Sequence, residues 1–294
     1  MRSKRSSGDN VAEHIREIKR RINNISNIRQ ITKAMHAIAM TKATRIKKQL
    51  TAERPYAEAL DSALAAILAE ASHAELSHPL LNSNPATETA ILILNADRGL
   101  CGRFKGTINR AGYDLLLKQN GKGRIIAGGE KARSFFTGKV DELLKVYSHL
   151  YEEPTRAAAK QIAKDLLSLY QSGKVEKIYV VYMRFFSELI QRVTVERILP
   201  IRPSEELSPT DALVEPDHGG ILNYFLPTYI TGKIFHYLLE TKMCEHTIRR
   251  QAMKAATDNA DDLIKSLTLT YNKARQQAIT RAIAEIIAGG EEIR

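Results

Sequence analysis

The sequence predicts a mixed α/β fold in which a very long helix at each end of the chain flanks a smaller domain of alternating strands and helices. The first observation is that two long stretches, Asp9 to Arg54 and Lys233 to Ala288, contain neither glycine nor proline. Both are rich in residues that lose little free energy on entering a helix. The second observation is a middle segment in which short β-branched runs alternate with helical patterns, which is typical of a mostly parallel sheet with helical crossovers.

The first long stretch carries apolar residues at coiled-coil spacing. The predicted contact positions are Ile15, Ile18, Ile22, Ile25, Ile28, Ile31, Met35 and Ile38. Two extra three-residue steps interrupt the strict heptad, so the pattern predicts a coiled-coil contact face with a local phase shift.

The last stretch has an apolar face with steps that average close to 3.6 residues. Its predicted positions are Met253, Ala256, Ala260, Leu263, Leu267, Tyr271, Ala274 and Ala278. A helix of that length measures roughly 80 Å, whereas a compact domain of this chain length has a radius of gyration of roughly 19 Å. We therefore expect the helix to project out of its own domain, and we expect the two amphipathic helices to pair with each other.

Between the long helices, the pattern predicts a doubly wound α/β domain from Ala90 to about Pro200. Pro55 is expected to kink the first helix, which resumes through Ala71 and is followed by a loop up to Thr87. The predicted strands are Ala90–Leu94, Ile125–Ala127, Ile178–Met183 and Val193–Leu199. The predicted helices are Ile108–Lys118, Glu130–Thr137 and Thr155–Gln171. Pro203, Pro209 and Pro216 predict a linker before the last helix.

Charge is concentrated in the two long helices. The formal net charge of the 294 residues is +11, and Asp9 to Arg54 holds eleven Lys or Arg and four Asp or Glu, a net charge of +7. Lys233 to Ala288 holds nine and six, a net charge of +3, so ten of the eleven excess charges lie in these helices. Basic helices on a nearly neutral domain predict an acidic partner.

Other segment types are not expected. No stretch approaches the ~18 consecutive apolar residues of a membrane span, and the first ten residues lack the apolar region of a secretory signal. The two cysteines, Cys101 and Cys244, have no metal-like spacing and fit free thiols in a reducing compartment.

A doubly wound sheet raises the possibility of a nucleotide-binding enzyme. The loop from Asn95 to Gly102 after the first predicted strand is neither a G-x-G-x-x-G turn nor a phosphate-binding loop. Gly121 and Gly123 precede a strand, and Ile126 stands where a third glycine would be needed. Nucleotide binding by this domain is therefore not expected.

Three residues of that loop are candidate functional residues, because α/β proteins place function at the carboxyl ends of strands. A reactive Cys101 thiolate favoured by Arg98 is one interpretation. A tight turn, in which Asp97 and Arg98 form a local pair and Cys101 serves packing, is the other and the favoured one. Cys244 and His246 do not predict a metal site, because residues i and i+2 on a helix point apart.

The basic face of the first helix allows a second class of function, a coiled-coil adaptor that binds nucleic acid electrostatically. Its residues are Arg16, Lys19, Arg20, Arg21, Arg29, Lys33, Lys42, Arg45, Lys47 and Lys48. There is no recognised nucleic-acid module and no aromatic interleaving along the face. A solvated helical face explains most such charge runs, and an acidic protein partner explains the rest.

Several segments, in order, resemble the gamma subunit family of F-type ATP synthases. They are Ile15–Ile22, Gln30–Met35, Ser77–Leu81, Asp97–Gly102, Ile178–Tyr182, Glu245–His246, Ala252–Ala260, Leu267–Gln276, Ala278–Thr280 and Ala284–Gly289. The similarity runs from about Glu13 to Gly289 without a large insertion.

The resemblance implies an antiparallel coiled coil of the N- and C-terminal helices and a Rossmann-like α/β domain at its foot. The corresponding division is a disordered tail over residues 1–10, an N-terminal coiled-coil helix over 11–71, the foot domain with its leading loop over 72–205, and a linker with the C-terminal coiled-coil helix over 206–294.

It also implies a function: the central rotor shaft that couples ion-driven rotation of the membrane ring to ATP synthesis or hydrolysis on the beta subunits. The implied partners are the alpha and beta subunits of the head, the epsilon subunit and the ring of c subunits, with no nucleic acid. Such a chain is a non-catalytic subunit without cofactor or metal. It is peripheral to the membrane, on the cytoplasmic face of a bacterial inner membrane.

By the same resemblance, partner contacts are expected at three places. Thr32, Lys33 and Met35 would meet an acidic beta loop. Asp97, Arg98 and Cys101 would lie at the shoulder of the foot, and Arg275 with Gln276 would hydrogen-bond a catch loop of beta. The cysteine-bearing insertion of the chloroplast chain is absent, so no thiol control is expected, and the end after Gly289 is charged where the family is small and apolar.

Overall fold

The computed structural model describes residues 7–73, 78–202 and 218–291, and the chain divides into two compact units. Unit 1 comprises Met1–Ile38 and Arg250–Arg294, and unit 2 comprises Ala39–Arg249. The helices are α1 (Ser7–His73), α2 (Phe104–Leu117), α3 (Glu130–Phe136), α4 (Arg156–Gln171) and α5 (His218–Glu291). The strands are β1 (Thr89–Leu94), β2 (Gly123–Gly128), β3 (Leu143–Tyr147), β4 (Lys177–Phe185) and β5 (Gln191–Leu199).

Unit 2 contains one five-stranded sheet with the order β3-β2-β1-β4-β5. The first four strands are parallel, and β5 runs antiparallel to β4. The strand order reverses at β1, where one chain crossover leads to β2 and a later one returns to β4. This is the doubly wound arrangement, so the predicted fold class is confirmed.

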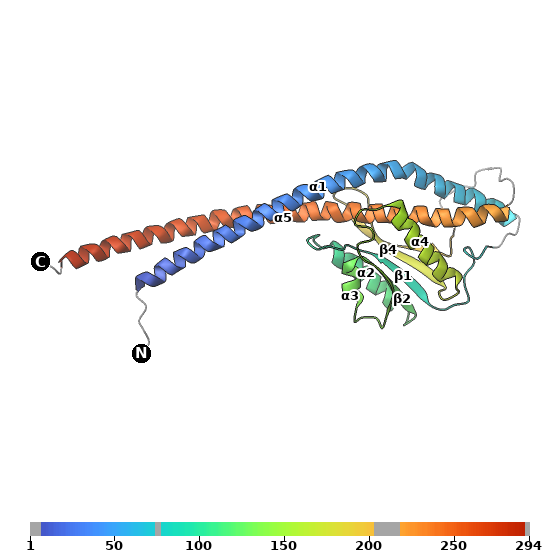
Figure 1. Cartoon of the computed structure of the whole chain (residues 1–294), viewed down its shortest axis with the longest axis horizontal. Helices are drawn as coiled ribbons and strands as arrows, with labels where there is room; N and C mark the ends of the chain where they lie inside the picture. The colour runs from blue at the N-terminus through green and yellow to red at the C-terminus, as the bar shows by residue number, and fades with distance from the viewer. Residues whose placement is uncertain (1–6, 74–77, 203–217, 292–294) are drawn as a thin grey trace. The chain divides into compact units, whose positions relative to one another are not determined.

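The two faces of the sheet pack against different helices, because successive side chains of a strand point to opposite sides. Ile91 and Ile93 of β1 pack in a cluster with residues of α2 and α3. Leu92 and Leu94 pack in the other cluster, with residues of α4 and with α1 and α5. Figure 1 shows α2 and α3 on one side of the strands and α4 and α5 on the other. All six β1 residues are buried, as expected for a central parallel strand.

Within unit 2, α1 and α5 lie side by side and antiparallel (Figure 1). Asp61 of α1 accepts a hydrogen bond from the Tyr229 hydroxyl at 3.0 Å and from Lys233 at 3.3 Å. Gly232 packs so closely on Leu60 that an added Cβ would lie 2.4 Å from a Leu60 methyl group. The glycine therefore permits the close approach of the two helices.

Unit 1 consists of the remaining parts of the same two helices, again antiparallel. Arg29 pairs with Asp261 at 2.5 Å, and the Thr257 hydroxyl donates to the Thr32 hydroxyl oxygen at 2.8 Å. As the residue number rises along α1, that of its partner falls along α5. The expected antiparallel pairing of the two terminal helices is therefore confirmed within unit 1.

The predicted contact face of α1 is wrong at three positions of its second half, whereas Met35 is half-buried as expected. Ile28, Ile31 and Ile38 are 53%, 59% and 58% exposed. The inward-facing positions are Ile18, Ile22, Ile25, Arg29, Thr32 and His36. These steps of four and three residues form an unbroken heptad without the expected phase shift. The prediction followed residue type, whereas the structure places Arg29 and Thr32 inward because Asp261 and Thr257 of α5 satisfy them.

The contact face of α5 was predicted with one error. Met253 and Ala260 are buried, and Leu267, Tyr271, Ala274 and Ala278 are half-buried as expected. Leu263 is 53% exposed, and Ile264 takes the inward position instead. The observed steps again alternate between three and four residues, which keeps one face of α5 toward α1.

Several element boundaries also differ from expectation. Strand β3 was not predicted, because its burial pattern runs from half-buried through exposed to buried at the edge of the sheet. Helix α1 continues through Pro55, and α5 begins at His218 and contains Pro227. Residues 7–10 of the expected disordered tail are helical, and the predicted linker over 203–217 lies outside the described residues.

Among the described residues, no helix combines the length and the apolar character that crossing a lipid bilayer requires.

The corrected contact face can be tested with two matched isoleucine variants in unit 1. Ile18 is 6% exposed and Ile31 is 59% exposed. We expect Ile18→Ala to lower the free energy of unfolding by about 2 kcal/mol, because it leaves a cavity between the helices. Ile31→Ala should change it by less than about 0.5 kcal/mol. Urea denaturation followed by circular dichroism measures both, and equal losses in the two variants would contradict the corrected face.

Candidate functional site

The candidate site is the loop from Asn95 to Gly102, which joins β1 to α2 in unit 2. It leaves the carboxyl end of β1, where the strand order reverses between β2 and β4. In doubly wound sheets this edge is the usual location of function.

A buried polar network holds the start of the loop. The Tyr151 hydroxyl donates to the carbonyl oxygen of Asn95 at 2.8 Å. The Asn95 side-chain amide donates to Asn109 at 2.7 Å, and Asn109 in turn donates to the carbonyl oxygen of Lys131 at 2.9 Å. Burial raises the pKa of Tyr151 well above its usual value, so the hydroxyl keeps its proton. The network ties the loop to α2 and α3.

Asp97 does not pair with Arg98, contrary to the interpretation of the turn as a local ion pair. Its side chain is 5% exposed. Its Oδ1 accepts hydrogen bonds from the backbone N–H groups of Glu130, at 2.9 Å, and His149, at 3.0 Å. The carboxylate therefore joins the β1 loop to the start of α3 and to the loop after β3.

Arg98 is exposed and binds Glu152 instead. Its Nε lies 2.9 Å from Glu152 Oε1, and Nη2 lies 3.4 Å from Oε2. Burial by itself would raise the pKa of Glu152, but the positive charge of Arg98 and the hydrogen bonds from Arg98 and His149 lower it overall. Glu152 is therefore an ionised carboxylate at neutral pH.

The two cysteines are both buried free thiols. Burial raises the pKa of Cys101, although the nearby Arg249 lowers it in part. Burial also raises the pKa of Cys244, and both side chains belong to the cluster between the sheet and α2. A buried thiol with a raised pKa is a poor nucleophile, and these observations favour the packing interpretation of Cys101.

Helix α5 fixes the loop through a buried ionic network that the sequence analysis missed. Glu245 lies 2.7 Å from both Lys242 and Arg249. Arg249 also reaches the carbonyl oxygens of Arg98, at 3.4 Å, and Gly99, at 3.3 Å. Burial would raise the pKa of Glu245, but the charges of Lys242 and Arg249 outweigh it and lower that pKa to about 2. The i, i+3 and i, i+4 spacing of these charges was the available signal.

His246 completes this network. Its Nδ1 accepts from Arg249 at 3.2 Å, and its Nε2 is buried without a hydrogen-bond partner in the described part of the chain. Burial lowers the pKa of His246 to about 4; Glu245 opposes the shift, and Arg249 adds to it. The imidazole is therefore neutral at pH 7.

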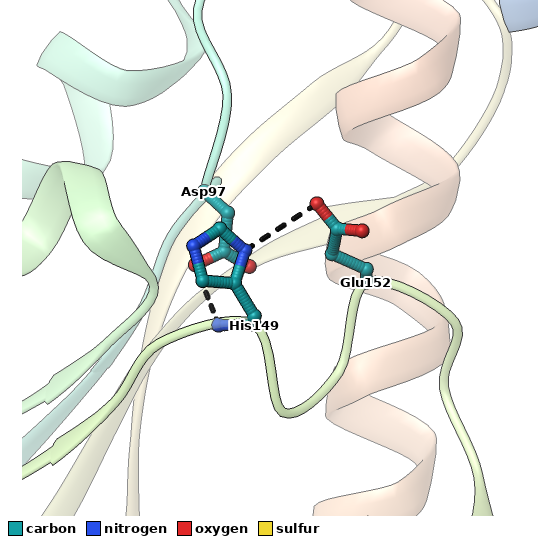
Figure 2. Close-up of side chains that lie close together, drawn as sticks. All are labelled: Asp97, His149 and Glu152. Carbon is teal, nitrogen blue, oxygen red and sulfur yellow. Dashed lines mark hydrogen bonds and ion pairs between the residues drawn. The ribbon is translucent and has the colours of Figure 1, made fainter.

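Within the described residues, one group that could hold a metal ion consists of Asp97, His149 and Glu152. Their ligand atoms lie within 4.8 Å of one another. Figure 2 shows the His149 ring in front of the Asp97 carboxylate and facing Glu152, with Glu152 on the same loop and Asp97 on the chain segment that follows β1. His149 Nδ1 lies 3.5 Å from Glu152 Oε1. The sequence pattern indicates a role for Asp97 but contains no signal that links this residue to the loop after β3.

The other predicted contact residues lie in unit 1. Thr32 is 8% exposed and faces Thr257, so its side chain is turned toward α5 and away from solvent. Lys33 is exposed and Met35 is half-buried on α1, and Arg275 and Gln276 are exposed on α5. Asp97, Arg98 and Cys101 lie in the loop after β1 in unit 2.

The lowered pKa of His246 predicts a dependence of stability on pH. The unfolded imidazole titrates near pH 6.5, so the folded chain binds fewer protons between about pH 6.5 and 4. The stabilisation is therefore complete above about pH 6.5 and is lost as the pH falls to about 4. Over this range, wild-type unfolding free energy should fall by about 2–3 kcal/mol more than that of His246→Gln, which keeps an acceptor for Arg249. Urea titrations at each pH measure this, and identical slopes would contradict it.

Comparison with known proteins places the chain in a family. The ATP synthase family model matches residues 14–292. The ATP synthase gamma chain of Desulfitobacterium hafniense is 36% identical over 278 residues, which cover 95% of this chain and 98% of that protein. The ATP synthase gamma chain of Pelotomaculum thermopropionicum is 37% identical over 278 residues, with 94% and 97% covered.

Solved structures share the fold. The rotor of the Euglena gracilis mitochondrial ATP synthase matches with a TM-score of 0.66 at 16% identity, covering 91% of this chain and 99% of that chain. The central stalk and c-ring structure from Tetrahymena thermophila matches with a TM-score of 0.60 at 20% identity, covering 77% and 99%. With curated relatives matching over nearly their whole length, this chain belongs to the ATP synthase gamma-chain family.

Proposed function

We propose that this chain is the central rotor shaft of a bacterial ATP synthase. The observation that carries the proposal is the surface of unit 1. Its two helices contact each other along one face of each helix. Outside that contact they expose a series of large aliphatic side chains. These are Ile28, Ile31, Ile38, Leu263, Leu269, Ile279, Ile283 and Ile287.

Such a surface calls for a protein partner. Burying one large aliphatic side chain is worth about 1.5–3 kcal/mol, and extended apolar surface on a soluble protein usually marks an interaction site. The excess positive charge of the first helix favours an acidic partner. In the proposed assembly, unit 1 enters the ring of alpha and beta subunits, and unit 2 meets the epsilon subunit and the ring of c subunits.

Asymmetry supplies the mechanism. A helix pair presents a different surface to each of three beta subunits, so each subunit is stabilised in a different conformation. A ligand shifts a conformational equilibrium by its difference in affinity for the two states. Rotation presents each surface of the helix pair to the next beta subunit in turn. The conformation of each beta subunit therefore changes with rotation, and this change links torque to the binding and release of nucleotide. ATP chemistry takes place on the beta subunits, and this chain is a non-catalytic subunit.

Specific contact residues follow from the family resemblance. Arg275 and Gln276 are exposed on α5 and are proposed to hydrogen-bond a catch loop of beta. Lys33, with Met35 beside it, is proposed to meet the acidic loop of beta. The Asp97–Gly102 loop is proposed to lie at the upper edge of the foot domain, next to the lower part of the ring of alpha and beta subunits. The whole complex is proposed to lie on the cytoplasmic face of the inner membrane. The basic-adaptor alternative gains no support from any matched relative.

The test is assembly and activity with the partner subunits. After co-expression with alpha and beta subunits of the same genome, native mass spectrometry should show one copy of this chain per six-subunit ring. The ATPase activity of the ring should disappear when the chain is omitted. A fully active ring that forms without this chain would overturn the proposal.

Two matched variants on α5 locate the contact with beta. Arg275 and Lys273 are both exposed and lie two residues apart. Arg275→Ala should lower the ATPase activity of the assembled complex severalfold, because it removes the proposed hydrogen bonds to the catch loop. Lys273→Ala removes a similar charge and should leave the activity nearly unchanged. Equal effects of both variants would reject the proposed role of Arg275.

A further inference from the structure

The side chains of Asp97, His149 and Glu152 converge from two separate loops of unit 2. Asp97 follows β1, whereas His149 and Glu152 lie in the loop after β3. One ligand atom from each lies within 4.8 Å of the other two. Figure 2 shows the Asp97 and Glu152 side chains close to the His149 ring.

The Asp97 carboxylate is incompletely satisfied. Oδ1 accepts two backbone hydrogen bonds, but Oδ2 is buried and has no hydrogen-bond partner in the described part of the chain. Asp97 as a whole is only 5% exposed. A buried carboxylate oxygen without a partner costs about 1–3 kcal/mol or more, and a cation that binds beside it is one physical explanation for its burial. A bound cation would supply the missing interaction.

The geometry of His149 suits this role. Its backbone adopts a left-handed conformation, with φ of 60°, and its N–H is held by Asp97. His149 Nδ1 lies 3.5 Å from Glu152 Oε1. Two ligands of a tetrahedral zinc ion with bonds of about 2.1 Å would be separated by roughly 3.4 Å. These two ligand atoms are therefore already close to the spacing that such an ion needs.

Arg98 is the competing cation. It pairs with Glu152, but its side chain is 75% exposed. An exposed ion pair of this kind is worth at most about 1 kcal/mol. A divalent ion that also binds Asp97 and His149 would displace the guanidinium at little cost, because Arg98 can remain solvated.

We propose that Asp97, His149 and Glu152 bind one divalent first-row transition-metal ion, with Zn²⁺ as the representative ion. One imidazole nitrogen with two carboxylate oxygens favours this class over Mg²⁺ and Ca²⁺, which prefer oxygen ligands alone. Water would fill the remaining positions. The ion would join the loop after β1 to the loop after β3, a structural role that does not depend on the proposed rotor function.

The test uses the full-length chain without a histidine tag, freed of metal by chelation, and titrated calorimetrically with ZnCl₂. We expect about one Zn²⁺ per chain at this site. His149→Asn removes the imidazole while keeping a residue that tolerates the left-handed backbone. Glu152→Gln removes a carboxylate without changing the shape. Each variant should weaken binding at least about tenfold, because even partners of metal ligands contribute 10–100-fold.

The matched control is Glu153→Gln, which removes the adjacent acidic residue, one that pairs with Arg45 and lies outside the triad. It should bind Zn²⁺ with the affinity of the wild type. Absence of Zn²⁺ binding, or equal affinity in wild type, His149→Asn and Glu152→Gln, would overturn the proposal. Displacement of Zn²⁺ by an equal concentration of Mg²⁺ would overturn the assignment to a transition metal.

Discussion

Unit 2 depends on the burial of charged residues in the part of α5 that crosses its core. From Ile234 to Thr247 nearly every α5 residue is buried, so this segment cannot present a polar face to solvent. Glu245 remains stable there only because Lys242 and Arg249 both contact it at 2.7 Å. Removing one member of such a group leaves an uncompensated buried charge, which costs about 3–5 kcal/mol. The spare hydrogen-bond donors of Arg249 then reach Arg98 and Gly99, so the same network orders the β1 loop.

Helices α1 and α5 have different structural roles in the two units. In unit 2, α1 and α5 pack against one face of the sheet and contribute to its larger core. In unit 1 they contact only each other among the described residues of that unit, and polar pairs such as Thr32 with Thr257 occupy part of the contact face. Polar residues at such positions fix the register of paired helices at some loss of stability. Several isoleucines point away from the helix–helix contact, where they would have stabilised the pairing of α1 with α5. A shaft that is held by a surrounding ring requires such an outward apolar surface.

The sequence predicted the parts of the fold that depend on local pattern. Four of the five strands, β1, β2, β4 and β5, were predicted from their β-branched runs. Helix α4 begins after Thr155, whose side chain caps it at 3.1 Å. Strand β3 was not predicted, because it has only five residues and the middle three are exposed. The inward face of α1 was not predicted correctly, because arginine is not a typical residue at a helix contact. Arg29 occupies an inward position only because it forms an ion pair with Asp261. The roles of Asp97, Glu245 and His149 depend on contacts between distant segments, which spacing along one chain cannot reveal.

The central claim is that this chain turns inside a ring of alpha and beta subunits. The most direct measurement is single-molecule rotation of the assembled complex, with the head fixed and a probe attached to the chain. A cysteine replacing the exposed Lys118 would carry the probe, since Cys101 and Cys244 are buried. The account predicts unidirectional rotation on addition of ATP, with three pauses per turn. ATP hydrolysis by the complex without rotation of the probe would contradict it.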